Sequence, residues 1–198
     1  MKEVSSFQQS KRAVKNGFTL LEILVAVSIS VLIVISIYGV YVVTSRSYHS
    51  TIAKAELAQN GRIALERLSR DIRQASDIVT TLPPTNSDLL NPPPNHLLFQ
   101  DGHYTYGIRY IEYRLNSQNL SRKVIHYYFS SDPTNWVLWN AQDQFGNPPL
   151  ESVDLDEIKA DKIFDLDFYG TNLVNIDLSV TDTKNTFYFK TISLARNI

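Results

Sequence analysis

The sequence contains no cysteine, so disulfide bonds, thiol catalysis and thiolate metal sites are all excluded. It has seven glycines, and no glycine-rich phosphate loop, dinucleotide-binding fingerprint or Gly-x-Ser-x-Gly elbow occurs among them. The four histidines are scattered, without the His-Glu-x-x-His spacing of a zinc enzyme. A formal net charge of -1 gives no general reason to expect a nucleic-acid partner. We therefore predict a protein that is not an enzyme and has no cofactor and no metal ion.

Charge is also missing from one long stretch, because no charged side chain occurs between Ile23 and Val43. A helix of that length reaches roughly 30 Å, which is about the thickness of the hydrocarbon core of a bilayer. The residues before Glu22 include one acid, Glu3, and several basic residues, namely Lys2, Lys11, Arg12 and Lys15. The positive-inside rule then predicts a single span of the cytoplasmic membrane, with the N-terminus in the cytoplasm and the rest of the chain outside.

Directly before the apolar run stands the string Gly17-Phe18-Thr19-Leu20-Leu21-Glu22. A short basic leader that ends in glycine, followed by Phe-Thr-Leu-Leu-Glu and an apolar span, closely resembles the type IV prepilin family. The resemblance implies that a membrane-embedded prepilin peptidase cuts between Gly17 and Phe18 and methylates the new amine of Phe18. It also implies three kinds of partner, namely other pilin or pseudopilin subunits, an inner-membrane assembly platform and membrane lipid.

Two other interpretations of the N-terminal region stay open. A secretory signal peptide has an apolar stretch of about 7–15 residues and a small-residue cleavage site. The run here is longer, and Val42-Val43-Thr44-Ser45-Arg46 after it is a poor site. An unprocessed single-span anchor that carries a binding or sensor domain is the second alternative. It fits the apolar run but leaves the string from Gly17 to Glu22 as a coincidence.

Two compatible roles are expected for Glu22. Thr19 and Glu22 have the Thr-x-x-Glu spacing of a capping box, in which the two side chains satisfy free amides at a helix start. Cleavage after Gly17 would also create an ammonium group at Phe18, one turn away, and a charge inside a membrane usually has a counter-ion. In the prepilin family the acid is taken to pair with the N-terminal amine of a neighbouring subunit. The resemblance therefore implies an assembly role for Glu22 and Phe18.

Beyond the apolar run, no residue between Thr44 and Val79 stops a helix. Charged residues there include Glu66/Arg70 and Arg67/Asp71 at i,i+4 spacing. Apolar or small residues recur at steps of three or four, which indicates one buried stripe; they are Leu57, Gly61, Ala64, Leu65, Leu68, Ile72, Ala75 and Val79. We predict one helix from Phe18 to about Ile78, in which Gly61 introduces a bend.

Strand patterns follow a proline-rich link at residues 81–96, through which a helix cannot continue. Trp136 and Trp139 are placed in a predicted loop at residues 130–150, where they either close the edge of the core or contact a neighbouring subunit. Strands are expected at residues 97–100, at 108–115 and 120–129 as a hairpin, and at 164–168, 174–180 and 186–195. The last three alternate between apolar and polar residues, which predicts an antiparallel sheet with one buried face, covered by the helix stripe.

The predicted fold is α+β, with a long N-terminal helix packed on an antiparallel β-sheet, and this is also the type IV pilin fold. The segments are a leader (residues 1–17), a transmembrane and assembly half-helix (18–43), an amphipathic half-helix (44–79) and a sheet domain (80–198). Three strings resemble minor pilins of the PilW type and pseudopilin J of type II secretion, namely Leu65 to Ala75, Tyr110 to Leu115 with Leu120-Ser121-Arg122, and Ile192 to Asn197. The resemblance implies a structural subunit that helps to prime or cap a filament of a pilus, a secretion system or a DNA-uptake apparatus.

Overall fold

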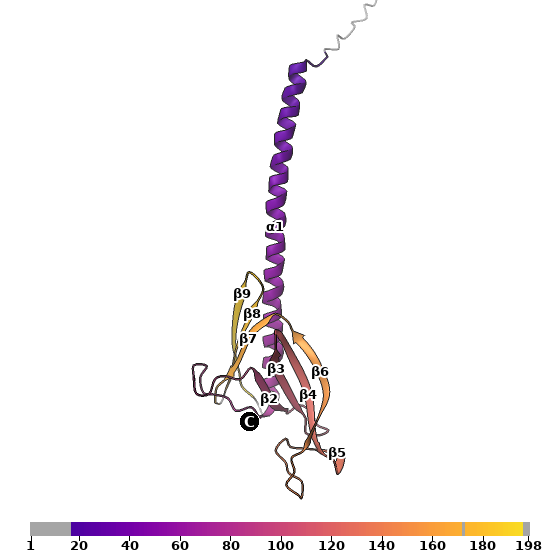
Figure 1. Ribbon diagram of the computed structural model, residues 1–198, viewed down its shortest axis with the longest axis vertical. Helices are drawn as coiled ribbons and strands as arrows, with labels where there is room; N and C mark the ends of the chain where they lie inside the picture. The colour runs from indigo at the N-terminus through magenta and orange to yellow at the C-terminus, as the bar shows by residue number, and fades with distance from the viewer. Residues whose placement is uncertain (1–16, 172, 196–198) are drawn as a thin grey trace, which may run out of the picture. The chain divides into compact units, whose positions relative to one another are not determined.

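The computed structural model describes residues 17–171 and 173–195, and the helix among them, α1, runs from Leu20 to Arg73 (Figure 1). The described strands follow α1 along the chain, and all their pairings are antiparallel. The fold is therefore α+β with a pilin-like architecture, as predicted. By its internal contacts the chain divides after Ser50 into two compact units.

In the first unit, α1 is long and apolar enough to cross a membrane. Apart from the half-buried Val42, its large apolar side chains are exposed as far as Val43, as expected for a surface that contacts lipid or other apolar helices. The hydroxyls of Ser28, Ser30 and Ser36 each donate to the carbonyl oxygen four residues earlier, at 2.8 Å. Because these hydroxyls are satisfied within the helix, the polar atoms of the serines need no water inside a bilayer.

The second unit contains two antiparallel sheets, whereas the sequence pattern predicted one. Sheet A has six strands in the order β1-β2-β3-β4-β5, with β6 also paired to β4. Sheet B has three strands in the order β7-β8-β9. The strand bounds are Ala75–Ile78 (β1), His96–Asp101 (β2), Tyr110–Asn116 (β3), Asn119–Phe129 (β4), Asp132–Val137 (β5), Leu150–Ala160 (β6), Ile163–Tyr169 (β7), Val174–Thr181 (β8) and Thr186–Ser193 (β9).

The predicted end of the helix near Ile78 is wrong, because α1 stops at Arg73 and the residues from Ala75 form β1. The amide of Gln74 closes the last turn on the carbonyl of Asp71 at 3.0 Å. β1 then pairs with β2. This pairing satisfies backbone groups of β2 that would have no partner if the helix continued. The apolar stripe gave no sign of this stop, since Ala75 is buried in the strand as it would have been in the helix.

The strands predicted after the link are all present, and the β3–β4 hairpin turns through Ser117, which has a φ of 58°. β5 and β6 were missed, because they lie in or next to the segment predicted as a loop. β6 is largely exposed on both faces and therefore lacks the alternation that marks a half-buried strand. Phe164, predicted to face the core, is 63% exposed, since an irregularity between Ile163 and Asp165 places Ile163 in the core instead.

The helix stripe covers the sheet domain, as predicted, but it packs against two sheets rather than one, and Figure 1 shows this part of α1 beside β3 and β8. Gly61 has a packing role that the apolar stripe did not predict. A Cβ atom at this position would lie 2.3 Å from Cε2 of Phe189 on β9. Glycine therefore allows the ring of Phe189 to lie directly against the helix backbone.

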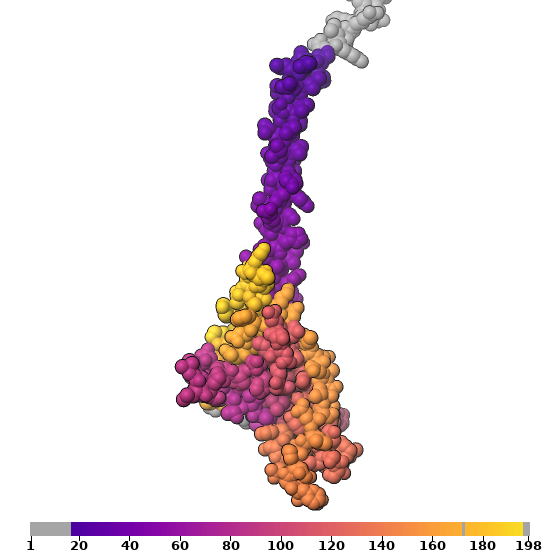
Figure 2. All heavy atoms as spheres, viewed as in Figure 1, coloured from indigo at the N-terminus to yellow at the C-terminus, as the bar shows by residue number. Residues whose placement is uncertain are grey.

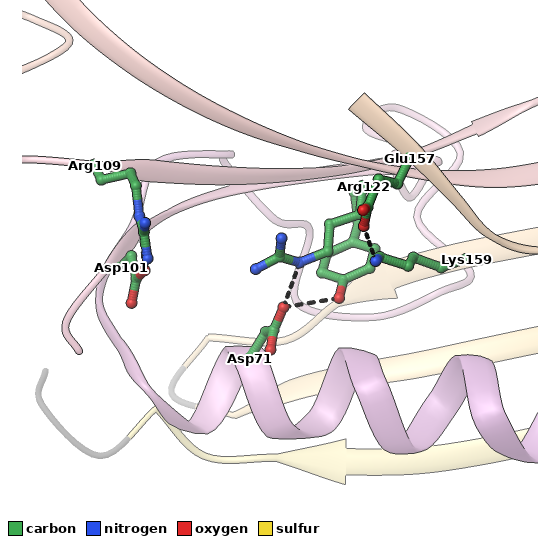
Figure 3. A network of polar contacts seen from close by, with 7 residues as sticks. Asp71, Asp101, Arg109, Arg122, Glu157 and Lys159 are labelled. Carbon is green, nitrogen blue, oxygen red and sulfur yellow. Dashed lines mark hydrogen bonds and ion pairs between the residues drawn. The ribbon is translucent and has the colours of Figure 1, made fainter. Parts of the chain in front are cut away.

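A polar contact joins the end of α1 to sheet A inside the second unit (Figure 3). Asp71 was predicted to pair with Arg67, but its Oδ2 atom instead accepts hydrogen bonds from the Tyr113 hydroxyl at 2.8 Å and from Arg122 Nε at 2.7 Å. Burial and the neighbouring Asp71 carboxylate raise the pKa of Tyr113 well above its usual range. The predicted pair of Glu66 and Arg70 is present on the exposed face, at 3.3 Å.

Candidate processing and assembly site at the N-terminus

The site predicted from the sequence lies where the described chain begins, at Gly17, Phe18 and Glu22. Residues 17–19 have no helical structure, and α1 begins directly after Thr19. The backbone amide of Thr19 donates to Oε2 of Glu22 at 3.3 Å, and the amide of Glu22 donates to Oγ1 of Thr19 at 3.3 Å. These reciprocal bonds form the capping box that the Thr-x-x-Glu spacing predicts.

The peptide bond between Gly17 and Phe18 lies in an open environment. Phe18 is 81% exposed, and within the described part of the chain no atom beyond Gly17 and its chain neighbours lies within 4 Å of the position that a Cβ atom on Gly17 would occupy. The bond is also outside the helix and outside the capping box, so its cleavage would leave the bonds between Thr19 and Glu22 unbroken. This geometry suits a bond that a protease must reach and extend before it cuts.

The Glu22 carboxylate uses one oxygen for the cap. Among the described residues, Oε2 accepts the bonds from Thr19, and Oε1 accepts none. A carboxylate oxygen in the first helical turn is stabilised by the positive end of the helix dipole. The second oxygen is therefore a ready acceptor for a cation. The basic leader residues of the sequence analysis lie outside the described residues.

A family model, described as a prokaryotic N-terminal methylation motif, matches residues 12–38. The match spans Gly17, Phe18, the capping box and most of the apolar run.
This motif indicates a type IV prepilin-like protein.
A comparison with curated proteins gives no significant match. The motif marks this prepilin-like protein as a substrate of processing enzymes, and proteins of this type generally assemble with other pilin subunits.

Within residues 17–171 and 173–195, no cluster of three or more histidine or acidic side chains has the geometry to hold a metal ion. The Trp136 ring is instead part of an aromatic stack between strands. Its ring centroid lies 4.4 Å from that of His126 on β4 and 5.6 Å from that of Tyr104, and the guanidinium carbon of Arg109 lies 4.0 Å from the Tyr104 ring centroid. Trp139 is 42% exposed. The stack joins residues far apart in the chain, so no local pattern predicts it.

Proposed function

We propose that this prepilin-like protein is a non-catalytic structural subunit of a type IV-like filament, of the minor pilin or pseudopilin kind, and helps to prime or cap that filament. Prepilin peptidase removes residues 1–17 and methylates the new amine of Phe18. The observation that carries the proposal is the methylation motif on an open Gly17–Phe18 bond, directly before a capped and apolar helix.

Assembly follows from the properties of the first helical half. Residues 18–43 form the membrane and assembly segment, and their exposed apolar side chains exchange lipid for the helices of neighbouring subunits. An unpaired charge near the end of a membrane helix costs less than the roughly 3 kcal/mol it costs at the centre, but it still favours a counter-ion. The free oxygen of Glu22 pairs with the methylated amine of Phe18 on the next subunit. This pair sets the axial register of two otherwise featureless apolar helices.

The same proposal assigns the location. The subunit is first inserted as a single-pass protein of the cytoplasmic membrane, with the leader in the cytoplasm and the sheet domain outside. Prepilin peptidase, the assembly platform and membrane lipid are its first partners. Other pilin or pseudopilin subunits replace the lipid in the filament.

Mass measurement of the mature chain tests the processing step. We expect a chain that begins at Phe18 and carries one added methyl group when it is purified from cells with an active prepilin peptidase. The same chain from cells without the peptidase should keep residues 1–17. An intact leader in both cells would contradict the proposal and support the alternative of an unprocessed anchor with a binding or sensor domain.

Substitution of Glu22 by glutamine separates the cap from the charge. Glutamine also completes a capping box, so Glu22→Gln keeps the helix start and removes only the negative charge. Glu22→Leu removes both. We expect both variants to insert into the membrane normally and both to be depleted from sheared filaments. Normal incorporation of Glu22→Gln with depletion of Glu22→Leu would show that the cap matters and the charge pair does not.

A further inference from the structure

Two strands of the second unit, β6 and β9, each have an edge without a partner strand. Among the described residues, β6 pairs only with β4 and β9 pairs only with β8. No backbone hydrogen bond of the described chain reaches their other edges. Figure 2 shows β6 in orange and β9 in yellow, on opposite sides of this unit. Free edges of 11 and 8 residues are templates for pairing with another strand.

On β9, the side chains on the outer face of sheet B have the order apolar, basic, apolar. Tyr188 is 79% exposed, Ile192 is 63% exposed, and Lys190 lies between them. Phe187 and Phe189 alternate with these residues and pack against the core. A strand with large exposed apolar side chains, no proline and low charge is prone to pair with another strand.

On β6, the outer face of sheet A carries the same order with the opposite charge. Ile158 is 64% exposed and Val153 is 46% exposed. Asp156 lies between them on the same face, because an irregularity at Asp154 shifts the register by one residue. The two edges therefore match in position, with an acid on one strand where the other has a base.

The strands next to β9 and β6 carry charged residues that continue the alternation of sign. Lys190 lies opposite Asp177 of β8, with its Nζ atom 2.6 Å from the carboxylate. Asp156 lies opposite Lys123 of β4, at 3.8 Å. With Lys190 of one copy opposite Asp156 of another, the row Asp177, Lys190, Asp156, Lys123 alternates in sign across four strands. Opposite charges on adjacent strands stabilise a sheet, and like charges destabilise it.

The backbone groups of the two edges also point the required way. In sheet B the amide of Thr181 donates away from β9, to the carbonyl of Lys162. Antiparallel ladders alternate between hydrogen-bonded and non-hydrogen-bonded pairs, so the amides of Tyr188 and Lys190 point to the free edge.

In sheet A the amide of Leu115 donates away from β4, to the carbonyl of Asn95. The same alternation, carried through the β3–β4 and β4–β6 registers, directs the amides of Asp156 and Ile158 to the free edge of β6. The residues whose side chains match are thus the residues whose backbone groups are free.

We propose that β9 of one copy of this chain pairs antiparallel with β6 of a second copy, with Lys190 opposite Asp156 and Tyr188 opposite Ile158. Pairing of β6 with itself is disfavoured, since four acids on that strand would face one another; they are Glu151, Asp154, Asp156 and Glu157. In such a pair one copy keeps a free β6 and the other keeps a free β9, so the contact continues in a row of copies rather than closing.

The ladder spans at most about 26 Å, which is small for a contact between freely diffusing proteins. It adds to the association of copies that a membrane or filament already concentrates. The contact involves only the second unit and holds for a cleaved or an uncleaved chain. Its failure and the failure of the proposed processing are therefore distinguishable.

A disulfide between copies tests the register directly, because the natural chain has no cysteine. Two differently tagged full-length copies, one with Tyr188→Cys and one with Ile158→Cys, are expressed together and oxidised in the membrane. Hydrogen-bonded antiparallel partners have Cα atoms about 5.5 Å apart, within the range of a disulfide. We expect several-fold more mixed dimer than with Tyr106→Cys, a 91% exposed control site, in place of Tyr188→Cys.

A proline on the edge tests the ladder itself. The amide of Ile192 also points to the free edge, so Ile192→Pro blocks pairing with a new strand and leaves the bonds to β8 in place. We expect Ile192→Pro to abolish the mixed dimer and Ile192→Ala to retain it. Crosslinking equal to that of the Tyr106→Cys control, or unaffected by Ile192→Pro, would overturn the proposal. So would a stronger crosslink of Tyr188→Cys with itself, or of Ile192→Cys with Ile158→Cys.

Discussion

Replacement of Asp71 by alanine removes the acceptor that joins the end of α1 to sheet A (Figure 3). The side chains of Asp71 and Arg122 are only 13% and 16% exposed, and Tyr113 is fully buried. Breaking a buried ion pair costs about 3–5 kcal/mol, and a buried hydroxyl left without a partner costs about 1–3 kcal/mol. The two penalties overlap, and Arg122 can reach water in part. We expect a total loss of about 3–4 kcal/mol in the free energy of unfolding.

Thermal unfolding of the full chain in detergent, followed by near-ultraviolet circular dichroism, measures this loss. The signal reports on the second unit, which contains both tryptophans. For a domain of this size, 1 kcal/mol shifts the Tm by about 2–4 °C, so Asp71→Ala should lower it by about 10 °C. Glu66→Ala is the matched control, because its ion pair with Arg70 is exposed on the same helix and is worth at most about 0.5 kcal/mol.

A triple variant tests the cause of the loss. Asp71→Leu, Arg122→Met and Tyr113→Phe together leave no charge or hydroxyl unpaired at this position. Replacement of a whole buried polar group by apolar side chains is often nearly neutral. We therefore expect the triple variant to recover most of the stability that Asp71→Ala loses. An unchanged Tm for Asp71→Ala, or a triple variant no more stable than Asp71→Ala, would refute the reasoning.

Three further predictions concern packing, pH and the helix start. Gly61→Ala should lower the Tm, because overpacking against Phe189 costs about 1–3 kcal/mol, whereas alanine is only about 1 kcal/mol more favourable than glycine in a helix. Adding Phe189→Leu to the Gly61→Ala chain should restore the Tm. Burial raises the pKa of Tyr113, and burial with the nearby Glu151 carboxylate raises the pKa of Tyr127 to about 12. The contribution of these two tyrosines to stability should thus be full below about pH 10 and should fall as the pH rises further, because the tyrosines of the unfolded chain lose their protons at a lower pH than those of the folded chain. Tyr113→Phe and Tyr127→Phe should each make this fall less steep when the free energy of unfolding is measured against pH. Thr19→Ala should weaken the cap by about 1 kcal/mol and speed amide hydrogen exchange at Glu22, whereas Thr19→Ser should not.

The helix and its N-terminal cap were readable from the sequence, because local spacing determines both. Thr19 and Glu22 are three residues apart, and the bonds between them need no other part of the chain. The stripe from Leu57 to Ile72 follows the 3.6-residue period and is buried as predicted. The β3–β4 hairpin and the alternating strands β7 to β9 were predicted for the same reason.

Only the tertiary structure decided where α1 ends, which strands pair and which edges stay free. Leu120 of β4 pairs with Ala160 of β6, which is distant in the sequence. Apolar and polar residues do not alternate along β6, because both of its faces are largely exposed. Asp71 has Arg67 one turn away, yet it bonds Tyr113 and Arg122, which only the folded sheet brings to it. A local pattern encodes which face of an element is apolar, but the partner of that face depends on contacts between residues distant in sequence.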